Sequence, residues 1–213
     1  MPLFNKWKEE GATWGIWEVT ESVDELRSLL TEKSCVLTEL NQFKCEGRRL
    51  EYLAVRVLLK ELLGEEFMIA HYPSGKPYLS DHSQFITISH TKGYVAVGVH
   101  PTKEVGIDIE QVSERVRKVS SRFVREDELQ GLNRHELDVQ LYELLLVWSA
   151  KEAMFKVLNT SEVDFLEHLF ISKFSFNSSG TLVGREFKTR RKKVFGIHYL
   201  THPDFVLTYL TTK

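Results

Sequence analysis

The segment Val105-Gly106-Ile107-Asp108-Ile109-Glu110 alternates apolar and non-apolar residues with a period of two. This period is typical of a half-buried β-strand, because successive side chains of a strand point to opposite faces of its sheet. Asp108 and Glu110 then share one face with Gly106, which leaves room for a ligand or another backbone to approach. Two such carboxylates repel each other unless a cation lies between them, and oxygen ligands suit Mg²⁺ or Mn²⁺ better than Zn²⁺. The segment therefore predicts either a divalent metal site or an ordinary strand with a solvated acidic face.

A second segment, Trp148-Ser149-Ala150-Lys151-Glu152-Ala153-Met154-Phe155-Lys156, has the composition and apolar spacing of a helix. Glu152 and Lys156 are four residues apart and so share one helix face. This third carboxylate and its lysine complement a metal-binding pair on the strand. The ordinary alternative is a surface Glu–Lys pair with Lys151 as a solvated charge, although Trp148 argues against a fully solvated helix.

Together these segments resemble the 4'-phosphopantetheinyl transferase superfamily, specifically its surfactin-synthetase-activating type. That family carries a G-[IV]-D-[IL]-E strand and, later, a W-[ST]-x-K-E-[AS]-x-x-K helix. Two upstream segments also match in order. Gly75-Lys76-Pro77 resembles the family's G-K-P turn, and Ile88-Ser89-His90-Thr91 resembles its N-[IV]-S-H-[ST] segment, with Thr87 in place of the asparagine. The resemblance covers about residues 48 to 156.

The resemblance implies an enzyme that transfers the 4'-phosphopantetheine arm of coenzyme A to a serine of an acyl or peptidyl carrier protein, with release of 3',5'-ADP. It implies that Asp108, Glu110 and Glu152 bind Mg²⁺, with Mn²⁺ as an alternative. The candidate catalytic residues are Glu152, Lys156 and Asp108. Glu152 is the candidate base for the serine hydroxyl, and Lys156 is expected to neutralise charge that develops on the pyrophosphate.

The resemblance also implies a binding site for the nucleotide end of coenzyme A. The residues assigned to coenzyme A are Arg48, Lys76, Ser89, His90 and Lys156. Arg49 remains an alternative to Arg48, since the two arginines are adjacent on this helix. Without the resemblance, the arginines of this helix are expected to be surface charges, and His90 an ordinary loop residue.

Residues 112–128, which follow the acidic strand, are of mixed character. Their basic side chains are Arg115, Arg117, Lys118, Arg122 and Arg125. Taken alone, the segment is a solvated connection; by the resemblance, it receives an acidic carrier protein. The family also carries an acid shortly after the phenylalanine that Phe123 matches, and Glu126, Asp127 and Glu128 all remain candidates, with Asp127 the nearest match.

The composition is that of a soluble globular protein, with 42% hydrophobic and 27% charged residues among 213. A formal net charge of −2 gives no overall case for nucleic-acid binding. The basic cluster at residues 188–193 is interpreted as a charged hairpin end, because no aromatic residues interleave it. Cys35 and Cys45 form no C-x-x-C pair, and no signal peptide or membrane span is apparent. These features favour a cytoplasmic protein, and the resemblance implies a monomer.

The expected fold class is α+β. The resemblance implies two similar subdomains, residues 1–103 and 104–213, related by pseudo-two-fold symmetry, each a long helix packed on a small, mainly antiparallel sheet. Long helices are expected at residues 46–63 and 136–158, and a capping box at Ser22 and Glu25 begins a shorter one. Strands are expected at residues 14–19, 85–89, 94–99, 105–110, 168–176, 181–187, 194–200 and 205–209.

The sequence is also compatible with two rival functions. The first is a non-catalytic module that binds coenzyme A or a carrier protein on the same fold. The intact set of three carboxylates and a lysine argues against it. The second is a different magnesium-dependent enzyme that acts on a diphosphate, and the G-K-P and S-H segments argue against that.

Overall fold

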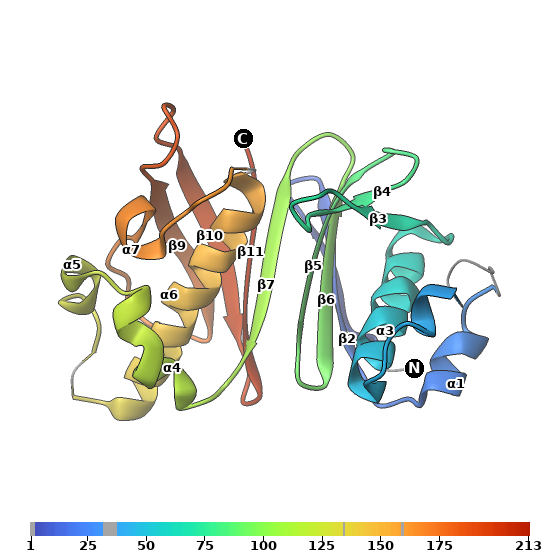
Figure 1. The fold of residues 1–213 in the computed structure, drawn as a ribbon. Coiled ribbons are helices and arrows are strands. Elements are labelled where there is room, and N and C mark those ends of the chain that lie inside the picture. The colour runs from blue at the N-terminus through green and yellow to red at the C-terminus, as the bar shows by residue number, and fades with distance from the viewer. Residues whose placement is uncertain (1–2, 32–37, 134, 159) are drawn as a thin grey trace. The chain divides into compact units, whose positions relative to one another are not determined.

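The computed structural model describes residues 3–31, 38–133, 135–158 and 160–213. The chain divides into two units, Met1–Lys103 and Glu104–Lys213. Both units combine helices with antiparallel strands, so the expected α+β class is confirmed. Figure 1 shows the elements of each unit and labels them where there is room.

The first unit is built on a four-stranded antiparallel sheet. Its strands are β1 (Leu3–Glu9), β2 (Ala12–Glu18), β5 (Phe85–Thr91) and β6 (Tyr94–His100), in the order β1-β2-β6-β5. A separate small hairpin pairs β3 (Ile69–His71) with β4 (Pro77–Leu79). The strands near residues 14–19, 85–89 and 94–99 confirm the expectation, whereas β1, β3 and β4 were not anticipated.

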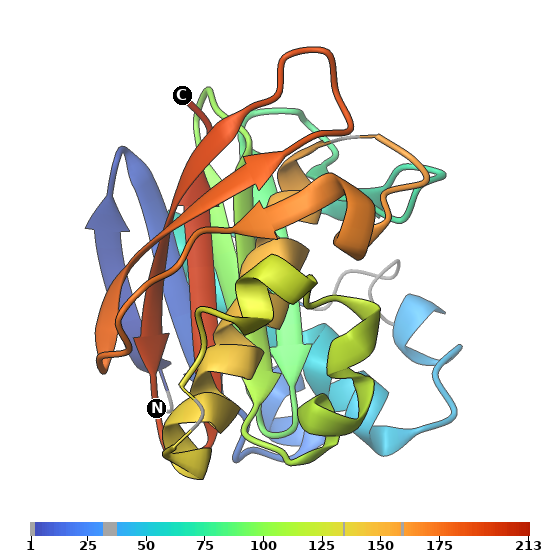
Figure 2. The same ribbon diagram turned by 90° about the vertical axis from the view of Figure 1, so that its left-hand side faces the viewer.

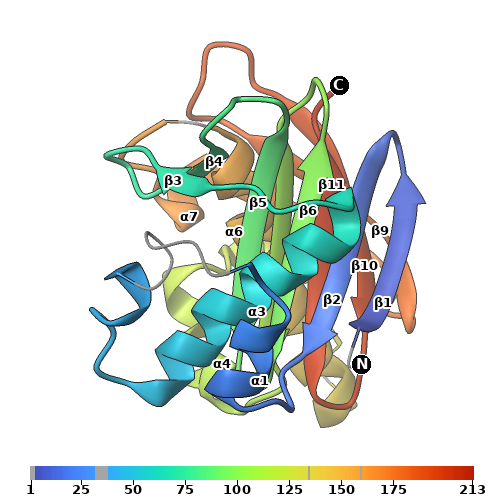
Figure 3. The same cartoon turned by 90° about the vertical axis from the view of Figure 1, so that its right-hand side faces the viewer.

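The long helix α3 (Glu46–Leu63) lies across one face of this sheet (Figure 3). Leu53, Leu58 and Leu59 are fully buried on its inner face, as the apolar spacing predicts. The helix ends at Gly64, whose φ of 84° is the left-handed conformation that glycine adopts without strain. The shorter helix α1 (Val23–Ser28) begins with the predicted capping box, in which the Ser22 and Glu25 side chains bind each other's backbone N–H groups.

The second unit is built on a five-stranded sheet whose paired strands are all antiparallel. Its strands are β7 (Val105–Gln111), β8 (Leu169–Ile171), β9 (Ser179–Glu186), β10 (Val194–Thr201) and β11 (Phe205–Thr211), in the order β7-β11-β10-β9-β8. Helix α6 (Leu137–Leu158) packs on this sheet and contacts β7 and β11 most extensively (Figure 2). The short helices α4 (Arg115–Val119), η1 (Ser120–Arg122), α5 (Glu126–Leu129) and α7 (Phe165–His168) complete the unit.

Two expectations about these strands were wrong. β7 is not half-buried, because every residue from Val105 to Ile109 is buried. The strand expected at residues 168–176 pairs only over Leu169–Ile171. Beyond it, Phe174 and Phe176 pack their rings beside Tyr199 and Tyr142, at centroid distances of 6.5 Å and 5.6 Å, instead of extending the ladder.

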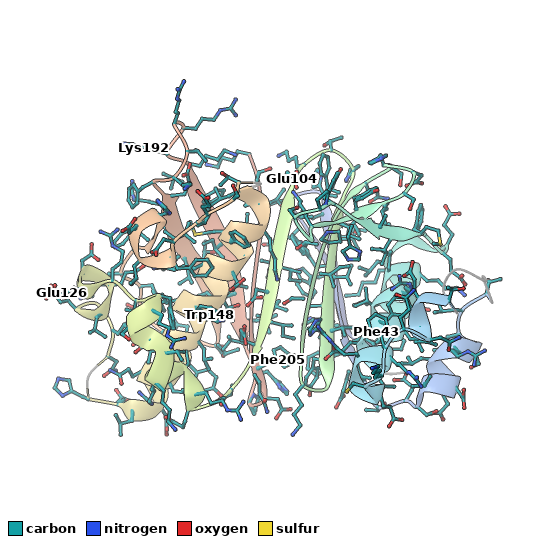
Figure 4. The ribbon with its side chains drawn as sticks, in the orientation of Figure 1. Phe43, Glu104, Glu126, Trp148, Lys192 and Phe205 are labelled. Carbon is teal, nitrogen blue, oxygen red and sulfur yellow. The ribbon has the colours of Figure 1, made fainter. Side chains whose placement is uncertain are left out.

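The basic cluster lies in the connection between β9 and β10, as its interpretation as a hairpin end predicts (Figure 4, where Lys192 is labelled). The buried Glu186 carboxylate accepts hydrogen bonds from the Thr189 hydroxyl and the backbone N–H groups of Thr189 and Lys193. Of the two cysteines, Cys45 is exposed with a free thiol, and Cys35 lies outside the described residues. Within the described part of the chain, no helix is long and apolar enough to cross a lipid bilayer.

Candidate functional site

The acidic strand and the long helix of the second unit meet at Gly106. A Cβ atom built on Gly106 would lie 2.2 Å from the carbonyl oxygen of Ala153 in α6. No real side chain tolerates that distance, so the space beside Gly106 is taken by helix backbone and not by a ligand. Because Ala153 follows Glu152 directly, this contact sets Glu152 opposite the strand that carries Asp108 and Glu110.

Gly106→Ala should therefore lower the free energy of unfolding by about 1–3 kcal/mol, the usual range for overpacking a core, and should also lower activity because α6 must move. Urea denaturation measures the first effect. Gly196→Ala in β10 is the matched control, since its added methyl would meet nothing closer than 4.0 Å. Equal stability for both variants would contradict the assigned backbone contact.

Asp108 is held from both its backbone and its side chain. The Lys156 ammonium lies 3.0 Å from Asp108 Oδ1 and 2.6 Å from the carbonyl oxygen of Ile107. The Ser149 hydroxyl donates to the carbonyl oxygen of Asp108 at 3.3 Å, and it lies 2.9 Å from the hydroxyl of Thr208, the residue paired with Asp108 across β11. The carboxylate is thus fixed in a buried position beside one cation.

Glu110 and Glu152 complete the acidic cluster. Glu110 accepts a hydrogen bond from the indole N–H of Trp148 at 2.8 Å. Burial, and then the neighbouring charge of Asp108, raise the pKa of Glu110. Burial raises the pKa of Glu152 to about 7, with further contributions from the charges of Asp108 and Glu110, while Lys156 opposes the shift. The charges of Asp108, Glu110 and Lys156 all act on Glu152, so the structure places these four side chains near one another.

The donor chemistry of this cluster fits a hard divalent cation. The charge of Asp108 raises the pKa of both Glu110 and Glu152, a bound cation would offset this repulsion, and the donor atoms of the three carboxylates are all oxygens. Among the residues that the structure describes, however, no three His, Cys, Asp or Glu side chains are gathered around a common point in the manner of a preformed metal cage. Asp108 is engaged instead by Lys156, and Glu110 by Trp148.

The first unit carries the residues assigned to the nucleotide. Arg48 Nη1 donates to Glu51 Oε2 at 2.7 Å and lies 2.9 Å from His90 Nε2. Both Arg48 and His90 are exposed. Arg49 instead donates to the carbonyl oxygen of Phe43 at 2.8 Å, a contact within the fold. This geometry favours Arg48 over Arg49 as the residue available to a ligand.

The other two nucleotide candidates lie in different surroundings. Ser89 is buried on β5, one residue before His90. Lys76 lies in the tight turn between β3 and β4, which is closed by a 2.9 Å hydrogen bond from the backbone N–H of Tyr72 to the carbonyl oxygen of Lys76.

Sequence reasoning missed one part of the second unit. If the helix lay on the surface, Lys151 would be a solvated charge. In the structure it is fully buried and forms an ion pair with the buried Glu128. Burial lowers the pKa of Lys151, and the charge of Glu128 opposes this shift. The helical period offered a signal, because Val147 four residues earlier and Leu158 seven residues later place Lys151 on an apolar stripe. Of the three consecutive acids, Glu128 is the buried one, while Glu126 and Asp127 are exposed.

Comparison with known proteins gives one matching family and several relatives. The model of the 4'-phosphopantetheinyl transferase superfamily matches residues 104–210. The 4'-phosphopantetheinyl transferase gsp of Aneurinibacillus migulanus is 29% identical over 149 residues, 63% of this chain and 60% of its own. The 4'-phosphopantetheinyl transferase psf-1 of Bacillus pumilus is 25% identical over 168 residues, 76% of this chain and 71% of its own. A Synechocystis sp. relative, also named for this transferase activity, is 29% identical over 112 residues, 49% of this chain and 46% of its own. The chain thus spans less than two thirds of the length of two of these relatives.

Proposed function

Because the chain belongs to the 4'-phosphopantetheinyl transferase superfamily, we propose that it transfers the 4'-phosphopantetheine arm of coenzyme A to a serine of an acyl or peptidyl carrier protein. The observation that carries this proposal is the cluster of Asp108, Glu110, Glu152 and Lys156, three neighbouring carboxylates beside one ammonium group. Such a cluster suits a reaction at a pyrophosphate, where negative charge must be held and a proton removed.

Each member of the cluster has a distinct task in this reaction. The serine oxygen bonds to the phosphorus next to pantetheine, the bond from that phosphorus to the bridging oxygen breaks, and 3',5'-ADP leaves. Glu152 takes the serine proton. The Lys156 ammonium neutralises charge on the departing diphosphate oxygen. Asp108, Glu110 and Glu152 would hold Mg²⁺, or Mn²⁺, which supplies Lewis-acid stabilisation of the phosphate oxygens when bound.

Arg48 and His90, with Lys76 and Ser89, are proposed to bind the nucleotide end of coenzyme A through its 3'-phosphate. The exposed guanidinium of Arg48 beside the exposed imidazole of His90 supports this assignment, because both groups donate hydrogen bonds to phosphate.

Arg48→Ala should raise the KM for coenzyme A by about tenfold or more, because a charge-assisted hydrogen bond contributes about 1.5–3 kcal/mol. Steady-state kinetics with varied coenzyme A measures the effect. Arg49→Ala is the matched control, since Arg49 is engaged with Phe43. Equal affinity of the parent protein for coenzyme A and its 3'-dephospho form would contradict the proposed binding of the 3'-phosphate.

The carrier protein is proposed to meet the basic segment around α4 and η1. Arg117 is tied to Glu114 and Gln140, and Arg125 to Asp127. Within the described chain, Arg115, Lys118 and Arg122 are exposed and form no ion pair, so these three are the charges open to an acidic partner.

Reversal of these three charges to glutamate should raise the KM for the carrier by tenfold or more and leave the KM for coenzyme A unchanged, because complementary surface charge accelerates encounter. The parent's carrier KM should also rise with salt, since exposed charges are screened. Lys8, Lys103 and Lys213, reversed together, form a control with the same change in net charge. If salt changed only the KM for coenzyme A, the proposed contact between the carrier protein and this basic segment would be contradicted.

The decisive experiment incubates the protein with coenzyme A, Mg²⁺ and an apo carrier protein, and follows the intact mass of the carrier. A gain equal to the phosphopantetheine arm is expected. Binding of coenzyme A without any gain on several carriers would favour the non-catalytic module instead. Transfer to another diphosphate substrate would favour the different magnesium-dependent enzyme.

The organisation of the chain is part of the same proposal. The units 1–103 and 104–213 are proposed to be similar subdomains related by pseudo-two-fold symmetry, which is supported by a long helix on an antiparallel sheet in each. We further propose that the protein acts as a monomer in the cytoplasm.

A further inference from the structure

Lys151 uses all three of its ammonium protons inside the core of the second unit. Its Nζ donates to the carbonyl oxygen of Phe123 at 2.6 Å, to Glu128 Oε2 at 2.8 Å and to the carbonyl oxygen of Phe165 at 3.0 Å. The Lys151 side chain is 0% exposed. None of its acceptors belongs to α6 itself, so the lysine ties the helix to three separate segments.

Glu128 is satisfied just as completely. Its Oε1 accepts from the backbone N–H of Ile171 in β8 at 2.6 Å, and its Oε2 accepts from the backbone N–H of Arg125 at 2.8 Å. Its side chain is 1% exposed. A buried ion pair of this kind adds little net stability over apolar residues of similar volume, because both charges lose hydration. Its contribution therefore lies in the geometry that it fixes.

That geometry is an aromatic clamp around Trp148. The two residues whose carbonyl groups Lys151 holds, Phe123 and Phe165, also flank the Trp148 indole with their rings. The centroid distances to Trp148 are 4.9 Å for Phe123, at an interplanar angle of 63°, and 5.5 Å for Phe165, at 41°. The clamped indole donates its N–H to Glu110 Oε1 at 2.8 Å. Figure 4 labels Trp148 on the helix.

We propose that Lys151 and Glu128 are positioning residues: by fixing Phe123 and Phe165 they hold the Trp148 indole in place, and the indole in turn orients the Glu110 carboxylate. The carboxylate's role as a cation ligand rests on the proposed function, whereas the chain of contacts from Lys151 to Glu110 does not. Removal of such an outer partner typically lowers metal affinity or activity by about 10–100-fold.

The first test observes the indole directly in the metal-free protein. In a ¹⁵N-labelled sample, Trp148→Phe identifies the Trp148 indole N–H resonance, and Glu110→Gln gives its position without a carboxylate acceptor. In Lys151→Met the resonance should move from the parent position toward that of Glu110→Gln. The double variant Lys151→Met/Glu128→Gln leaves no unpaired buried charge and should show the same movement of the resonance. It replaces the single variant in the test if the single variant folds poorly.

The second test titrates Mn²⁺ alone into the parent and the variants by calorimetry. Affinity should fall by about 10–100-fold in both Lys151 variants. Ile197→Val, a core change in β10, is the matched control and should alter neither the resonance nor the affinity. In the transfer assay, the loss should appear in kcat while the KM for coenzyme A is retained.

Two results would overturn the inference: a folded Lys151 variant whose indole resonance stays at the parent position, or the same movement in Ile197→Val. The proposed function can fail separately. If the parent transfers no arm and the resonance still moves, the positioning role stands and the transferase assignment falls.

Discussion

Glu152→Gln is expected to lower kcat by about 10²–10⁴-fold, the usual contribution of a general base, while the metal-free protein becomes more stable at pH 8. Glutamine keeps the size of the side chain and removes both the proton acceptor and a half-buried negative charge. Loss of activity coupled to a gain in stability is characteristic of a residue retained for chemistry. A purely structural glutamate would give the opposite pairing.

The pH dependence of that gain follows from the pKa of Glu152. Burial and the charges of Asp108 and Glu110 raise this pKa from 4.5 to about 7, so the native state binds more protons than the unfolded state between these values. The stability of the parent should therefore fall as pH rises through this window, by up to roughly 3 kcal/mol. Glu152→Gln lacks this loss. Its gain in free energy of unfolding over the parent should therefore be largest at pH 8 and should vanish near pH 4.5.

Thermal unfolding of both proteins with a chelator present, at pH 4.5, 6 and 8, measures the effect. Glu167→Gln in α7 is the control, because Glu167 is exposed and should change neither activity nor the pH profile. An advantage of Glu152→Gln that is the same at every pH would show that Glu152 does not carry a buried charge.

Asp108→Asn should lower turnover at ordinary magnesium by at least about a hundredfold, comparable to the loss of one preorganised electrostatic group in an active site. Asparagine can still accept the hydrogen bond from Lys156 through its amide oxygen, so the buried position is preserved. What is lost is a unit of negative charge beside the proposed cation. The magnesium concentration that gives half-maximal activity should rise accordingly.

The same change should act on the neighbouring acids. The charge of Asp108 raises the pKa of both Glu110 and Glu152, so its removal should lower both pKa values. The loss of stability that accompanies their ionisation should then occur at lower pH. Asp138→Asn, an exposed carboxylate at the start of α6, is the matched control. Turnover near the parent rate at sub-saturating magnesium would remove the basis of the proposed metal site.

The sequence predicts the strongly periodic elements and misses those without a pattern. The helices α3 and α6 carry long apolar stripes, and both were anticipated nearly to the residue. The edge strand β1 has only partly buried or exposed residues, so no apolar alternation marks it. Alternation in β7 was correctly read as a strand, but it wrongly implied a solvated face, because α6 covers the face that carries Asp108.

The candidate site divides in the same way. The two sequence motifs contain Asp108, Glu110, Glu152 and Lys156, and the structure places these four side chains near one another. The choice among the acids of residues 126–128 could not be made, because it depends on which carboxylate faces Lys151 across the core. Lys151 also contacts the backbone carbonyl groups of Phe123 and Phe165. Because every residue type has such a carbonyl, these contacts cannot be predicted from the sequence.

Lys151 and Lys156 stand five positions apart on one helix, yet they differ sharply toward reagents dissolved in water. The Lys156 side chain is 25% exposed and the Lys151 side chain is 0% exposed. An amine-selective acylating reagent should therefore modify Lys156 in the native protein and reach Lys151 only after the second unit opens. One proteolytic peptide spanning both lysines would then report two quantities by mass spectrometry: the protection of Lys156 by a bound diphosphate, and the fraction of molecules whose core has unfolded.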